Sequence, residues 1–209
     1  PSRLLRAKQK ILELLELRGD SKTALIAFAG SAHIVMPITN DREMIRHFLD
    51  ALSENIMPVS GKLPETILPL ADNLLKTSRV PGTLLLIGDG ATSNTVIAFN
   101  DFFSSQSAQL IVWTIGKTAH SDDPTGELAS EVIPVQLEQL KALSDESDGR
   151  LVLMSNDNTD VKRVDNYIKH NLVIVDDNSR PWHDSGYPFV FLVALIFLFW
   201  FRKGWTLQW

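Results

Sequence analysis

The stretch "TLLLIGDGATSN", residues 83–94, decides the fold class of this chain, because it joins two elements of different periodicity. Residues 83–87 are largely apolar and have the length of a buried strand, which Asp89 and Gly90 end. Hydroxyl and amide side chains of the kind that begin helices follow, and a helix is expected over 95–103. The stretch therefore predicts a strand, a turn and a helix, with Asp89 at the carboxyl end of the strand.

The same alternation is predicted on both sides of this stretch. The expected strands span residues 23–29, 30–37, 109–115 and 150–154. The expected helices span residues 2–17, 41–52, 64–76, 134–144 and 159–170. Strands that alternate with helices of this length indicate an α/β fold with a doubly wound, mostly parallel sheet that helices cover on both faces.

Two features of this pattern concern the first half of the chain. Residues 23–29 are almost entirely apolar, as in a strand that is buried on both faces. The first expected helix has no strand before it, although a doubly wound fold usually opens with one. We therefore expect that the first, central strand is missing from this sequence.

Composition narrows the classes of function. The 209 residues suffice for one domain with a sizeable core and an appendage. A net charge of -5 provides no electrostatic footprint for a polyanion, so no nucleic-acid partner is expected. The absence of cysteine excludes disulfides, thiol catalysis and cysteine-ligated metal sites.

The C-terminal region predicts a membrane anchor. Residues 187–201, "YPFVFLVALIFLFWF", contain no charged side chain, and Trp182, Trp205 and Trp209 flank them like interfacial anchors. Fifteen residues of helix cover only roughly 22 Å of a hydrocarbon core of about 30 Å, so flanking residues must complete the crossing. Because Arg202 and Lys203 follow directly, the C-terminus is expected in the cytoplasm and the globular part on the opposite side.

These observations predict the domain organisation. An α/β domain over residues 1–170 is followed by a juxtamembrane linker over 171–185, a transmembrane helix over 186–203 and a cytoplasmic tail over 204–209. The chain begins with Pro1 rather than methionine, and no secretory signal precedes the domain. We therefore expect further sequence upstream.

The motifs that could indicate catalysis are incomplete. "GKT" at 116–118 resembles the end of a phosphate-binding loop, but that motif needs a glycine where Ile111 stands. The five histidines have no zinc-binding spacing, and no nucleophile elbow occurs. "RGDS" at 18–21 fits a helix end at Gly19 better than an adhesion ligand. The chain is therefore not expected to be an enzyme.

Asp89 remains as the one candidate metal ligand. A site for a hard cation such as Mg²⁺ needs several carboxylates and hydroxyls that converge from separate loops. A lone acid at a strand end caps the next helix or binds loop amides more often than it binds metal. On spacing alone, both interpretations stay open.

Several blocks of the sequence resemble a known family. "GDSKTALIAFAGSAHIVMPITN", "LLLIGDG", "LIVWTIG" and the tail "RPWHDSGYPFVFLVALIFLFWFRKGW" are similar to von Willebrand factor A (VWA) domain proteins of the bacterial aerotolerance (Bat) type. The resemblance spans essentially the whole chain. It implies a Rossmann-like domain at the bacterial inner membrane, with a metal-ion-dependent adhesion site at the top of the sheet.

The resemblance also implies how such a site is built. A D-x-S-x-S loop after the first strand, a threonine on a second loop and an aspartate on a third hold Mg²⁺ or Mn²⁺, and Asp89 matches the third element. The first element would stand upstream of this sequence. Lys62 occupies the position where relatives carry the threonine, and Thr66 lies about one helical turn further on. An ammonium group at this place could pair with Asp89 and repel a divalent ion, or Lys62 could be a solvated loop residue.

The function expected from the resemblance is that of a membrane-anchored protein-interaction module without chemistry of its own. Its partner would bind at the carboxyl-end edge of the sheet. A MoxR-type AAA ATPase and sibling VWA proteins are the partners that the family implies, in envelope stress tolerance or assembly. The alternative is an α/β hydrolase or nucleotide-dependent enzyme whose active site includes upstream residues.

Overall fold

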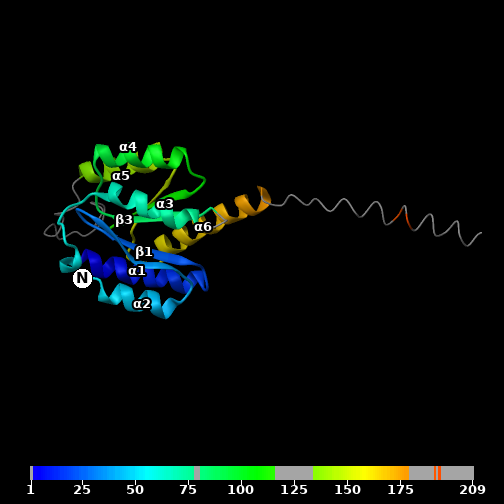
Figure 1. Cartoon of the computed structure of the whole chain (residues 1–209), viewed down its shortest axis with the longest axis horizontal. Coiled ribbons are helices and arrows are strands. Elements are labelled where there is room, and N and C mark those ends of the chain that lie inside the picture. The colour runs from blue at the N-terminus through cyan, green and yellow to red at the C-terminus, as the bar shows by residue number, and fades with distance from the viewer. Residues whose placement is uncertain (1, 78–80, 116–133, 179–190, 192, 194–209) are drawn as a thin grey trace, which may run out of the picture. The chain divides into compact units, whose positions relative to one another are not determined.

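The computed structural model describes residues 2–77, 81–115, 134–178, 191 and 193 of the chain (Figure 1). The chain divides into two compact units, Pro1–Val173 and Ile174–Trp209. The first unit contains all of the described strands and is the subject of the following paragraphs.

A parallel sheet of three strands forms the centre of the first unit. Its strands are β3 (Thr83–Gly88), β4 (Gln109–Thr114) and β5 (Arg150–Leu153), in the order β3-β4-β5. The connections contain helices α4 (Ser93–Ser104) and α5 (Pro134–Glu146). The predicted alternation of strands and helices is confirmed, and the parallel pairing brings the carboxyl ends of the three strands to one edge.

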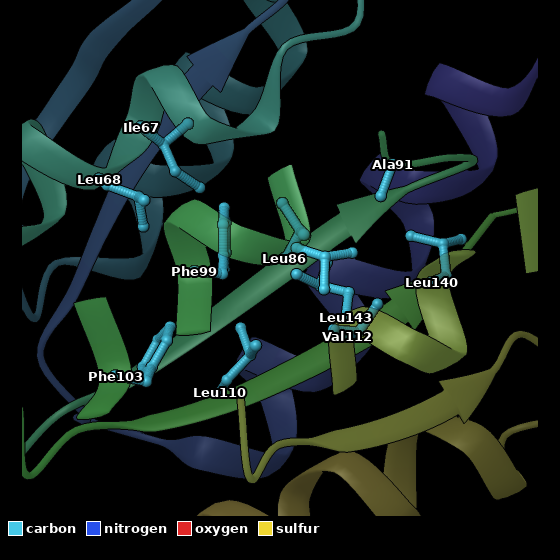
Figure 2. Close-up of a cluster of buried hydrophobic side chains, with 11 residues drawn as sticks. Ile67, Leu68, Leu86, Ala91, Phe99, Phe103, Leu110, Val112, Leu140 and Leu143 are labelled. Atoms are coloured by element: carbon cyan, nitrogen blue, oxygen red, sulfur yellow. The ribbon is translucent and has the colours of Figure 1, made fainter. Parts of the chain in front are cut away.

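The central strand β4 is buried on both faces, and its side chains alternate between two clusters. Leu110 and Val112 pack with residues of α4 and α5 in the first cluster, which Figure 2 shows. Ile111 and Trp113 pack in the second cluster against α1 (Arg3–Arg18) and α6 (Thr159–Asn178). Helices therefore cover both faces of the parallel sheet, as the periodicity predicts.

The remaining described strands form an antiparallel hairpin with its own two-stranded sheet. β1 (Thr23–Phe28) pairs with β2 (Ala32–Thr39), with Ile26 opposite Ile34. Every residue of β1 is half-buried, and its side chains pack on both faces: Ile26 and Phe28 lie against the cluster of Figure 2, and Leu25 lies against the cluster around Met36. Both faces are therefore covered, as expected, but less completely than those of β4. Among the described strands, β1 is paired along one edge only. These strands thus form two sheets rather than the single sheet of a complete doubly wound fold.

Helices also pack against the hairpin. Met36 of β2 lies in a third cluster with residues of α1 and of α2 (Arg42–Ala51), and Asp41 caps α2 by accepting a hydrogen bond from the Met44 amide. A short 3₁₀ helix, η1 (Glu54–Ile56), follows α2.

The helix predicted over 64–76 is divided into two segments. The 3₁₀ segment η2 (Pro64–Ile67) precedes α3 (Leu68–Lys76), which has a proline, Pro69, in its first turn. Proline has no amide hydrogen to donate to the preceding turn. This absence accounts for the change of helix type at the junction.

The last described helix is longer than predicted. α6 continues to Asn178, beyond the expected end at residue 170 and into the predicted linker. The predicted membrane segment 186–203 lies outside the described residues except for positions 191 and 193. Among the residues that the structure describes, no helix has both the length and the apolar character needed to cross a membrane.

Candidate functional site

Asp89 lies where the sequence predicts, directly after β3 at the carboxyl-end edge of the parallel sheet. It does not cap the following helix. Thr92 does so, through a reciprocal capping box with Thr95. The side chain of Asp89 is 24% exposed, so the carboxylate stands at the rim of the domain and is available for another interaction.

Two basic side chains converge on the carboxylate of Asp89. The Lys62 ammonium lies 2.9 Å from Oδ2, and the Arg3 guanidinium lies 2.6 Å from the same oxygen. The side chains of Lys62 and Arg3 are 57% and 48% exposed. Of the two interpretations of Lys62 that the sequence left open, the structure has the pairing with Asp89, and Arg3 is a second partner.

The position of Lys62 is fixed by the contact of its loop with the end of β1. Gly30 donates its amide hydrogen to the Val59 carbonyl at 2.9 Å, and Leu63 donates to the Ala29 carbonyl at 2.9 Å. Gly61 has a φ of 154°, and a Cβ at this residue would lie 2.8 Å from the Cα of Gly30. Only glycine permits so close a crossing of two backbones, and the crossing places Lys62 beside Asp89.

Arg3 is a helix residue in an electrostatically unfavourable position. It is the first residue of α1, Arg6 stands one turn further, and the first turn contains no acidic residue. The positive end of the helix dipole disfavours cations at this place. Contacts with the strand ends offset this cost, because Arg3 binds Asp89 after β3 and Arg6 binds the Asn156 side chain after β5. The start of α1 is thereby attached to the carboxyl-end edge.

The described residues around Asp89 do not fit a divalent cation. Within the described part of the chain, no group of three or more histidine, aspartate or glutamate side chains could hold a metal. The Thr66 hydroxyl donates to the Leu63 carbonyl at 2.6 Å, away from the carboxylate. A metal ion at Asp89 would have to compete with both Lys62 and Arg3 for the same oxygen.

A second carboxylate at the same edge is also engaged within its own loop. Asp157, in the loop after β5, accepts hydrogen bonds from the hydroxyls of Ser155 and Thr159. These bonds favour the charged carboxylate and lower the pKa of Asp157 to about 2. The loop therefore stabilises its own conformation and provides no further ligand beside Asp89.

Among the contacts that sequence reasoning missed, two bear on function. The pairing of Arg3 with Asp89 was not predicted, although an arginine in the first turn of a helix is a signal that a nearby anion compensates it. Ser31 and His33 also lie within hydrogen-bonding distance, at 3.0 Å between Oγ and Nε2. That pair is exposed at the β1–β2 turn rather than at a strand-to-helix turn, so it lacks the position of a nucleophile elbow.

Comparison with solved structures identifies the fold. BatB from Bacteroides thetaiotaomicron aligns with a TM-score of 0.67 and 23% sequence identity, over 82% of this chain and 89% of BatB. The chain has the fold of a Bat-type protein. The resemblance drawn from the sequence is thereby confirmed at the level of the fold.

Two further solved structures have a similar fold. An aerotolerance-related membrane protein from Bacteroides fragilis aligns with a TM-score of 0.64 and 23% identity, over 83% of this chain and 89% of that protein. The vWF domain of the type V pili tip protein Mfa5 from Porphyromonas gingivalis aligns with a TM-score of 0.52 and 13% identity, over 81% and 89%. No protein-family model matches the sequence, and no curated protein matches it.

Proposed function

We propose that this chain is a membrane-anchored VWA-type interaction module that binds a protein partner at the carboxyl-end edge of its sheet, without metal. The observation that carries the proposal is the convergence of Lys62 and Arg3 on Asp89 at an exposed rim. In this arrangement the two basic groups take the role that a bound cation would have. An acidic side chain of the partner is the group that they would attract.

The exposure of Lys62 supports this role. An ammonium group has three N–H donors, and the contact with Asp89 Oδ2 uses one of them. With 57% of its side chain exposed, Lys62 can direct a second donor toward a carboxylate of the partner. Charge-assisted hydrogen bonds of this kind contribute about 1.5–3 kcal/mol when they are formed at an interface.

The wider assignment rests on the fold and on the sequence. The neighbours described above include BatB, an aerotolerance-related membrane protein and a vWF domain from a pilus tip protein. We extend this to a role in envelope stress tolerance or assembly, together with a MoxR-type AAA ATPase and sibling VWA proteins. The proposed location is the bacterial inner membrane, with residues 186–203 crossing the lipid bilayer and the domain on the extracytoplasmic side.

A metal-dependent module is the nearest alternative, and calorimetry separates it from the proposal. We expect that titration of the full chain in detergent micelles with millimolar Mg²⁺ or Mn²⁺ produces no saturable heat, because Lys62 and Arg3 already neutralise Asp89. The variant Asp89→Ala should give the same trace as the unmodified chain. Saturable heat that disappears in Asp89→Ala would show a metal site at this carboxylate and would refute the metal-free proposal.

Photo-crosslinking tests whether this edge binds a protein. Val59 is 51% exposed and lies with Lys62 in the loop of residues 57–63, between η1 and η2. A photoreactive residue at this position should crosslink a discrete protein in membranes of the source bacterium. Crosslinking should persist in the presence of EDTA, and Lys62→Glu should reduce it about tenfold, since a charge-assisted contact becomes repulsive. Lys22→Glu is the matched control, because Lys22 is exposed at the opposite end of β1.

The crosslinking experiment has a defined negative outcome. A photoreactive residue at Ile97, which is 59% exposed on α4, reports random collisions with a different face. If Val59 and Ile97 yield the same products, or if Lys22→Glu and Lys62→Glu have the same effect, the carboxyl-end edge is not a specific binding surface.

A further inference from the structure

A cavity of about 340 Å³ adjoins the cluster formed by Arg3, Lys62 and Asp89. Its apolar walls come from Leu4, Phe28, Leu52 and Met57. Leu4 follows Arg3 directly in the chain, and Gly61, which also lines the cavity, directly precedes Lys62. The cavity and the basic groups therefore belong to the same edge of the domain.

The chain segments that line the cavity also carry exposed apolar side chains. Leu5 of α1 is 46% exposed, and Ile56, Val59 and Leu63 in or beside the Lys62 loop are 53%, 51% and 39% exposed. An apolar surface with a charged group at its border is typical of interaction sites rather than of ordinary solvent-exposed faces. Its concave part is the place where a partner side chain would be anchored.

We propose that the cavity binds an apolar side chain of an extended partner segment, and that the acidic residue next to it in the partner pairs with Lys62. This inference rests on the proposed function and specifies the chemistry of the partner. An apolar cavity and an exposed ammonium group lie at one edge of the domain. A partner segment with an apolar residue next to an acidic one should therefore bind more tightly than a segment that has only one of these residues.

The size of the cavity limits the occupant. Cavities that hold small molecules range from about 300 to 1,000 Å³, and this one lies at the lower end. That volume suits one or two side chains rather than a large cofactor. Its walls are partly exposed at Ser53, Ser60 and Gly61, which leaves a path for a peptide backbone along the rim.

The four methionines of the chain allow a direct test by NMR. Met57 lines the cavity, whereas Met36 and Met154 are buried elsewhere and Met44 is exposed on α2. With methionine methyl groups labelled in the full chain in micelles, the probe is the peptide acetyl-Gly-Phe-Asp-Gly-amide. We expect a saturable shift of the Met57 methyl signal, while the signals of Met36 and Met154 remain in place.

Two control peptides separate the two halves of the proposed ligand. Acetyl-Gly-Phe-Asn-Gly-amide has no negative charge and should bind about tenfold more weakly, which is the effect of one charge-assisted hydrogen bond. Acetyl-Gly-Gly-Asp-Gly-amide has no apolar side chain and should leave the Met57 signal unchanged. Equal binding of all three peptides, or no saturable shift with any of them, would overturn the inference.

A cavity-filling variant tests independently whether the peptide binds in the cavity. Ser53 lines the cavity, and its side chain makes no capping hydrogen bond, so Ser53→Phe adds a ring without removing a contact of the helix cap. We expect this variant to lose the Met57 response, whereas Ser107→Phe, at an exposed position outside the cavity, retains it. Unchanged signals of Met36 and Met154 show that each variant is folded.

The outcomes also distinguish the cavity from the proposed function. If binding of the peptides requires Lys62 but is indifferent to phenylalanine and to Ser53→Phe, the cavity inference is wrong and the proposed acidic recognition stands. If binding of the peptide requires its phenylalanine and is lost in Ser53→Phe, but Lys62→Gln has no effect, then the pairing of Lys62 with the acidic residue of the partner is refuted. If a photoreactive residue at Val59 gives no specific crosslink when Lys62 is unchanged, the proposed function itself is refuted.

Discussion

Replacement of Asp160 by alanine should lower the free energy of unfolding by about 3–5 kcal/mol, which is the usual effect of removing one partner of a buried ion pair. The Asp160 side chain is 1% exposed and lies 2.9 Å from the Lys10 ammonium. Its other oxygen accepts hydrogen bonds from Trp113 Nε1 at 3.2 Å and from the Ser155 amide at 3.1 Å. The variant would leave Lys10, which is 7% exposed, without this carboxylate.

Urea denaturation of the full chain in micelles, followed by circular dichroism, measures this loss. Asp101→Ala is the matched control, because Asp101 is exposed on α4 and its substitution should change the free energy by no more than about 0.5 kcal/mol. The double variant Lys10→Met with Asp160→Leu should recover part of the loss, since it removes both charges but leaves Trp113 Nε1 and the Ser155 amide without their acceptor. If Asp160→Ala and Asp101→Ala have equal effects, the buried network does not hold α1 and α6 to the sheet.

The elements of this fold could be predicted from the sequence because local periodicity determines them. The strand at 83–88 and the helix after it follow from an apolar run, an acidic turn and a hydroxyl cap, and Thr92 does cap α4. The burial of β4 on both faces follows in the same way from its unbroken apolar run. The position of Asp89 at a strand end needed no more than this information.

The partial burial of β1 could not be predicted in the same way. Residues 23–29 are apolar whether the strand has one neighbour or two, because apolar character records burial of side chains and not the pairing of edges. The number of neighbours depends on which other segments are present. The division of the 64–76 helix was also missed, because a proline in the first turn of α3 can follow either a loop or a 3₁₀ turn.

The composition of the candidate site was only partly accessible from the sequence. Lys62 was found through its position relative to Asp89, 27 residues away, in a pattern that resembles a family. Arg3 is 86 residues from Asp89, and Lys10 is 150 residues from Asp160. Long basic side chains reach several partners, so such pairs depend on how helix α1 packs on the sheet, which no local pattern specifies.

Replacement of Phe99 by alanine should lower the free energy of unfolding by about 3–5 kcal/mol, the usual cost of truncating a fully buried phenylalanine. Phe99 is 0% exposed and lies in the cluster of Figure 2 with Leu86, Leu110 and Val112. Its ring centroid is 6.2 Å from that of Phe103 on the same helix. The cost has two parts, the lost free energy of transferring the ring from water and the free energy of the cavity that remains. The cavity remains because the paired strands β3 and β4 cannot move in to fill the space.

Ile97 provides the control within the same helix. It is 59% exposed, so Ile97→Ala removes apolar atoms that already contact water and should change the free energy of unfolding by no more than about 0.5 kcal/mol. Phe99→Leu, which retains most of the volume, should give an intermediate loss. If Phe99→Ala costs no more than Ile97→Ala, α4 does not pack on the sheet as described. The position of Asp89, which the β3–α4 connection supports, would then have to be reconsidered, and with it the pairing of Lys62 on which the binding surface depends.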